Sequence, residues 1–192
     1  MLSPTVAALV ARLQSISPMP DDDTLDSLPT EDHPLKIYDT IIQELKQETE
    51  VEYPLELIPP LLEAFGIGDG NGVFGHAVHL IEKYPNAQEL YPVIQQATRS
   101  SNPGTRRWCC DILGRRRNRD DEAFLIERLG DKVAEVRRTA LLSIGRIAQW
   151  YDMEHTISLI LPLLQDNNQD VQWYAEQTIE EIRRPKGRII DK

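Results

Sequence analysis

The stretch "LGDKVAEVRRTALLSIGRI", residues 129–147, decides the fold of this chain. Its apolar residues recur at helical spacing after a short turn that contains Asp131. With Val136 as a reference position, the small Ala140 lies four residues later and Ile144 lies eight residues later. The pattern predicts the end of one helix, a tight turn and a second helix.

The same frame occurs three more times along the chain. Each copy has a reference residue, a small residue four positions on and an aliphatic residue eight positions on: Val73, Ala77 and Ile81; Thr105, Cys109 and Leu113; Val171, Ala175 and Ile179. The four reference residues are separated by 32, 31 and 35 positions, and an apolar helical segment precedes each of them. Because one helical hairpin cannot bury its apolar face alone, a recurring hairpin predicts an α-solenoid.

The repeat resembles the HEAT-repeat family, whose pattern is an Asp in the turn, Val-Arg at the start of the second helix, a small residue and an aliphatic one. The third copy, with Asp131 and Arg137, matches the pattern in full. The fourth copy, with Asp166, has Gln172 in place of the Arg, and the second copy keeps Arg106 but has Ser100 in place of the Asp. The resemblance implies a ladder of Asp and Arg along stacked turns, so we expect Asp131, Arg137 and Asp166 to be structural.

The expected fold class is all-α: a right-handed α-α superhelix of about four HEAT-like helical hairpins plus N-terminal helices. Residues 1–34 are expected to form an N-terminal helix and an acidic, proline-rich linker, residues 35–184 the repeat domain and residues 185–192 a tail. The position five residues after the reference is apolar in the first three copies but Glu176 in the fourth. This change predicts a final repeat whose outer face meets water.

The charge of the chain is divided unevenly between its halves. The net charge of the 192 residues is −10. Residues 1–96 hold 16 Asp and Glu against 4 Lys and Arg, a net charge of −12, while residues 97–192 hold 15 against 17, a net charge of +2. This polarity favours a basic protein partner and argues against general binding to nucleic acid or to an anionic membrane.

The expected location is the cytoplasm. The two cysteines, Cys109 and Cys110, are adjacent and form no disulfide framework, which favours a reducing compartment. The N-terminus has no basic leader, and no apolar run reaches the roughly 20 residues that a membrane span needs.

Candidate partner-binding residues come from both halves. Asp39, Glu44 and Glu48 belong to the acidic half. Arg107, Arg138 and Trp173 share the second position after the reference residue, and Trp108 and Tyr174 share the third, with Trp150 nearby in the sequence. In the HEAT family the second helices line the concave face, and Trp, Tyr and Arg are common interface anchors. Packing between repeats is the alternative role for these side chains.

Four other motifs could suggest a metal, thiol, phosphate or anion site, and for each of them we favour a structural role. His76 and His79 lack a third metal ligand, and the two cysteines occupy positions of the repeat that are expected to be buried. "GDGNG", residues 68–72, lacks the strand and lysine of a phosphate loop. The arginines of residues 115–119 are expected to close a helix, with an anion contact as the alternative. We therefore expect no catalytic residue, metal, cofactor or required small molecule.

The function expected from the sequence is a non-enzymatic protein-binding module that presents an acidic, curved helical surface to a basic protein. Small acidic HEAT-type proteins of bacteria include toxin-neutralising immunity proteins, which this chain resembles in size, charge and fold. Two alternatives stay open: a HEAT-like enzyme such as a DNA glycosylase or a bilin lyase, and an assembly factor or subunit of a complex.

Overall fold

The computed structural model describes residues 2–30, 33–148 and 153–184. Within these ranges every regular element is a helix, which confirms the predicted all-α, solenoid-like fold. The chain forms two compact units, residues 1–113 and 114–192. Trp150 and the tail of residues 185–192, to which the sequence predictions extended, lie outside the described residues.

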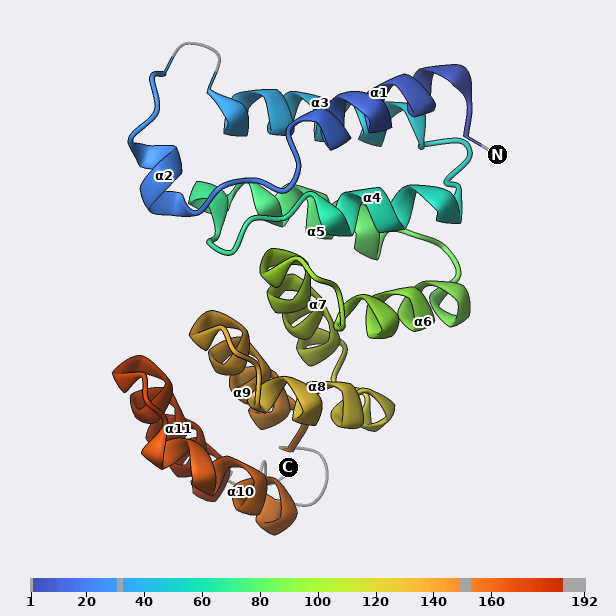
Figure 1. Ribbon diagram of the computed structural model, residues 1–192. Coiled ribbons are helices and arrows are strands. Elements are labelled where there is room, and N and C mark those ends of the chain that lie inside the picture. Colours follow the sequence, from blue (N-terminus) through green and yellow to red (C-terminus); the bar gives the residue numbers. More distant parts are fainter. Residues whose placement is uncertain (1, 31–32, 149–152, 185–192) are drawn as a thin grey trace, which may run out of the picture. The chain divides into compact units, whose positions relative to one another are not determined.

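The first unit is built from successive layers of helices. In one layer α1 (Pro4–Ser15) packs on α3 (Pro34–Glu48), and this pair lies against α4 (Ile58–Glu63) and α5 (Phe74–Glu82) (Figure 1). The unit also contains α2 (Asp22–Asp26), α6 (Ala87–Ala97), residues 103–113 of α7 (Pro103–Arg116) and the 3-10 turns Leu55–Leu57 and Gly70–Gly72. α4 packs on α6 as well as on α5, so hairpins of this unit bury one another's faces.

The second unit is a stack of two hairpins. It contains α8 (Glu122–Leu129), α9 (Ala134–Ala148), α10 (Met153–Ile160), α11 (Gln169–Arg183) and the 3-10 turns Arg119–Asp121 and Leu161–Gln165. α9 packs on α8, its hairpin partner, and on α11 of the next hairpin (Figure 1). α11 starts after Asn168, whose side chain accepts a hydrogen bond from the Val171 amide at 3.1 Å.

The repeat frame read from the sequence coincides with the buried side of the second helices. The small residues Ala77, Cys109, Ala140 and Ala175 are all fully buried. A small side chain at this position allows a neighbouring helix to approach closely. Glu176 of the last copy is exposed, as expected for a final repeat.

The segment expected to be a solvated linker contains a short helix and two buried side chains. Asp21 starts α2 by accepting a hydrogen bond from the Thr24 amide at 2.9 Å. Met19 and Leu25 are buried, although the acidic residues between them are mostly exposed. Burial of these two apolar side chains removes them from water and holds the segment against the rest of the first unit.

Candidate functional site

Three of the predicted partner-binding residues form one cluster on the surface of the second unit. The rings of Trp173 and Tyr174 meet edge to face, with centroids 4.7 Å apart and an interplanar angle of 84°. The guanidinium carbon of Arg138 lies 5.4 Å from the centroid of the Tyr174 ring. Trp173 keeps 53% of its surface exposed. We call Arg138, Trp173 and Tyr174 the Trp173 cluster.

The packing of α9 on α11 assembles this cluster. Arg138 and Trp173 occupy the same position of successive repeats, so the stacking of two second helices brings them into neighbouring places. Arg138 is also paired with Glu135 one turn earlier, with Nη2 and Oε2 2.5 Å apart. The cluster therefore offers a broad apolar ring beside a cation that is already oriented, which is a chemistry suited to protein contacts.

Trp108 and Arg107, two further candidate partner-binding residues, make their contacts within the first unit instead. Trp108 is only 9% exposed and stacks on Phe65, with ring centroids 5.2 Å apart, while Phe74 meets its ring edge-on. The Arg107 guanidinium lies 4.5 Å from the Trp108 ring centroid and donates a hydrogen bond to the carbonyl oxygen of Gly68. Both side chains therefore follow the alternative of internal packing, and we leave them out of any partner-binding surface.

The three acidic candidates all lie on α3, and two of them have partners within the protein. Asp39 Oδ1 lies 2.7 Å from Nδ1 of His76, and Glu44 Oε2 lies 2.9 Å from Nη1 of Arg12. Glu48 is exposed near the end of the helix. α3 therefore remains an acidic surface, with part of its charge offset by neighbouring side chains.

The turns that precede α7, α9 and α11 are held by the same pair of hydrogen bonds. In each turn one side chain accepts from the amide two residues later, at 3.0, 3.0 and 2.8 Å: Ser100, Asp131 and Asp166. In each case a side chain at the start of the helix donates to the carbonyl oxygen six residues earlier: Arg106, Arg137 and Gln172. The second copy has Ser100 in place of the Asp, and the fourth has Gln172 in place of the Arg. Both copies nevertheless make the same two hydrogen bonds as the third.

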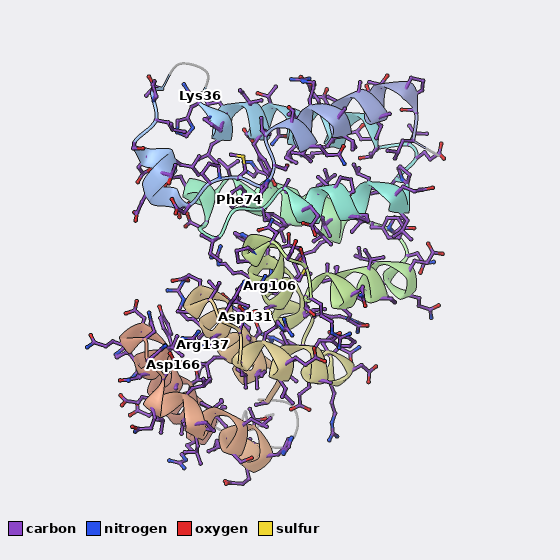
Figure 2. The ribbon with its side chains drawn as sticks, viewed as in Figure 1. Lys36, Phe74, Arg106, Asp131, Arg137 and Asp166 are labelled. Carbon is purple, nitrogen blue, oxygen red and sulfur yellow. The ribbon has the colours of Figure 1, made fainter. Side chains whose placement is uncertain are left out.

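Arg137 additionally joins the two hairpins of the second unit. Arg137 and Asp166 lie beside each other (Figure 2). The Arg137 guanidinium donates to both carboxylate oxygens of Asp166 and to Asn167 Oδ1. The hydrogen bonds from Arg137 lower the pKa of the Asp166 carboxyl. The contact between Arg137 and Asp166 therefore links two successive repeats.

The glycine-rich turn of residues 68–72 holds a carboxylate from the chain itself. The Asp22 oxygens accept hydrogen bonds from the Asp69 amide at 3.0 Å and the Gly70 amide at 3.1 Å. Gly70, Asn71 and Gly72 all have positive φ, a conformation that glycine adopts without strain. The Asn71 amide donates to Asp69 Oδ1 at 2.9 Å, within the turn itself. This contact could not be predicted from the sequence. Asp22 belongs to the run of acidic residues 21–23, and nothing in that run indicates a bond to residues 69 and 70.

The cysteine pair, named in the sequence as a possible reactive site, lies in the interior. Cys109 and Cys110 are buried and form no disulfide, and burial raises the pKa of the Cys109 thiol well above its usual range. In the described part of the chain no three His, Cys, Asp or Glu side chains lie close enough together to hold a metal ion. The same residues include no helix that is long and apolar enough to cross a membrane.

Comparison with known proteins gives a family match over part of the chain. A family model described as HEAT repeats matches residues 90–180, a range that begins within α6 and ends within α11. Curated proteins give no match to this chain.

Proposed function

Since a model of HEAT repeats matches residues 90–180 of this chain, we propose that the protein is a non-enzymatic module that binds a basic protein partner. Repeats of this kind stack helices into extended surfaces, which suit contact with another macromolecule better than enclosure of a small substrate. HEAT repeats generally mediate contacts between proteins, and the proposal assigns this role to the present chain.

The observation that carries the proposal is the exposure of Trp173 in the Trp173 cluster. A tryptophan that is 53% exposed leaves a large apolar surface in water, and burial of that surface against a partner is favourable. Its edge-to-face contact with Tyr174 fixes the ring, so little side-chain freedom is lost on binding. Trp, Tyr and Arg are the residues in which binding energy at protein interfaces is usually concentrated.

The charge of the first half favours a basic partner. A net charge of −12 over residues 1–96 attracts positively charged proteins and speeds their encounter with this chain. Neutralisation of a basic toxin, as by an immunity protein, is the specific role that we propose within this class.

No observation favours the enzymatic alternatives. A DNA glycosylase requires a basic groove lined with aromatic side chains, and Trp108, an aromatic residue with arginines beside it in the sequence, lies in the core of the first unit. A bilin lyase or an assembly factor is supported by no particular arrangement of side chains.

A quantitative pull-down tests the proposal. The immobilised wild-type chain and the Trp173→Ala variant are incubated with extract of the source cells, and bound proteins are compared by isotope-labelled mass spectrometry. We expect a basic protein that binds the wild type at low salt and is reduced at least tenfold by Trp173→Ala. Leu161→Ala, a change at another exposed apolar residue of the same unit, is the matched control and should retain it. Equal recovery by wild type and Trp173→Ala, or recovery of nucleic acid alone, would overturn the proposal.

A further inference from the structure

An apolar groove runs between α4 and α6 on the first unit. It has a volume of about 420 Å³ and is lined by Pro59, Leu62, Glu63, Pro92, Val93, Gln96 and Ala97. Five of these seven side chains are hydrocarbon, and Glu63 is the one lining residue that carries a charge. We call this feature the α4–α6 groove. It belongs to the first unit alone and shares no residue with the Trp173 cluster.

The walls of the groove are rigid before any partner arrives. Proline side chains lose almost no conformational freedom when they are buried, so contacts with Pro59 and Pro92 have a small entropic cost. Leu62 is buried and fixed by the core, while Pro59 and Pro92 stand exposed at the surface. A groove with these properties is prepared to receive an apolar side chain.

Pro92 is costly for the helix that carries it. It stands inside α6, where a proline removes a backbone hydrogen bond and crowds the preceding turn. A residue type that is unfavourable for its secondary structure is expected mainly at positions where its side chain has a functional role. Here the ring of Pro92 forms a wall of the groove.

The charge around the groove selects the partner. No Lys or Arg lines it, and it lies in the part of the chain where acids outnumber bases 16 to 4. Glu63 stands at its edge, exposed and oriented by a hydrogen bond of 2.8 Å from Ser100 Oγ. A cation beside a bound apolar side chain would meet this carboxylate, whereas an acidic segment would be repelled.

We propose that the α4–α6 groove binds a segment of a basic protein in which an apolar side chain is flanked by Lys or Arg. The apolar side chain fills the space between Pro59, Pro92 and Val93, and a flanking cation pairs with Glu63. The inference rests on the proposed function, because it names a second surface for the same class of partner, and it adds a recognition element that the Trp173 cluster does not supply.

Selection from a random peptide display library tests the proposal directly. We expect peptides enriched by the wild-type chain to carry an aliphatic or aromatic residue flanked by Lys or Arg. Val93→Asp should weaken their binding more than tenfold, because a carboxylate would then lie in the apolar groove. Glu63→Gln should weaken it about threefold, the effect of losing one exposed ion pair. The matched control Leu161→Asp adds the same charge at an exposed site of the other unit and should change binding less than twofold.

The same selection separates failure of this inference from failure of the proposed function. Trp173→Ala should not affect peptides that occupy the groove, so peptides lost with Trp173→Ala but kept by Val93→Asp would support only the Trp173 cluster and overturn the groove. Enrichment of acidic peptides, or of none, would overturn it as well. Methyl NMR of the wild-type chain gives a readout without any variant: a selected peptide should shift the Leu62 and Val93 methyl signals, and unchanged signals count against the groove.

Discussion

Arg137 and Asp166 join neighbouring hairpins of the second unit through a two-point contact. Nε of Arg137 lies 2.7 Å from Oδ2 of Asp166, and Nη2 lies 2.6 Å from Oδ1. The two side chains are only 10% and 7% exposed. The third guanidinium nitrogen donates to the carbonyl oxygen of Asp131 at 2.7 Å, so one side chain holds its own turn and the next. Planar two-point geometry of this kind is specific to arginine.

Removal of Arg137 is expected to destabilise the second unit strongly. Arg137→Met leaves the Asp166 carboxylate nearly buried without its cation, and breaking such a pair costs about 3–5 kcal/mol of the free energy of unfolding. Urea denaturation followed by circular dichroism measures this loss. Arg138→Gln is the matched control, since its ion pair with Glu135 is partly exposed and should contribute less than about 1 kcal/mol. A loss of less than about 1 kcal/mol for both variants would show that the contact between Arg137 and Asp166 contributes little to stability.

The stability of the protein should depend on the ionisation of Asp166. Hydrogen bonds from Arg137 lower the pKa of this carboxyl in the folded state. A carboxyl with a lowered pKa stabilises the fold above its unfolded pKa, about 3.9, and this contribution is lost as pH falls through the folded pKa. The difference in unfolding free energy between wild type and Asp166→Asn should therefore be constant above about pH 5 and shrink below pH 4. A difference that stays unchanged from pH 7 to pH 2 would contradict the assignment.

A double-mutant cycle can test the contact between Asp22 and the glycine-rich turn. A Cβ atom at Gly68 would overlap the Asp22 carboxylate, so Gly68→Ala should expel it and cost about 1–3 kcal/mol through loss of its two amide hydrogen bonds. In an Asp22→Ala background the same change meets no carboxylate and should cost less than about 0.5 kcal/mol. Chemical denaturation of the four proteins gives the coupling, and additive effects would rule out the contact.

The periodic part of the fold could be predicted from the sequence because it depends on repeated packing. Ala140 and Ala175 are small for one shared physical reason, and both are fully buried. A contact that occurs only once in the chain leaves no repeated residue pattern from which it could be predicted. The two amides that hold Asp22 lie 47 and 48 residues away, and sequence spacing alone could not indicate either bond.

Position within the repeat also failed to separate exposed from buried aromatic residues. Trp108 and Tyr174 share a frame position, yet Trp108 is enclosed by Phe65, in the irregular segment after α4, and by Phe74, at the start of α5. Tyr174 is only half-buried, beside the exposed Trp173. The α4–α6 groove was missed for a similar reason, because its residues join two helices whose register the frame does not specify. Pro92 inside a predicted helix was the one available signal.

The cysteines are expected to be inert in the folded protein. Cys109 and Cys110 have no exposed surface, and burial raises the pKa of the Cys109 thiol, so little thiolate is present or accessible at neutral pH. An aromatic disulfide reagent at pH 8 should label fewer than one thiol in native buffer within minutes and two in urea. Rapid labelling of the native chain would show that this part of α7 opens readily.

Two helical glycines should respond to alanine with opposite signs. A Cβ at Gly104, in the first turn of α7, would lie 2.6 Å from the backbone carbon of Gly66 and closer still to the Phe65 carbonyl oxygen. Backbone atoms cannot move aside as a flexible side chain can, so Gly104→Ala should destabilise the first unit by about 2 kcal/mol or more. A Cβ at Gly75, within α5, meets nothing within 4 Å. Because alanine favours helix over glycine by up to about 1 kcal/mol, Gly75→Ala should raise the free energy of unfolding. If thermal melts showed Gly104→Ala to be as stable as the wild type, the close approach of α7 to the Phe65–Gly66 backbone would be disproved.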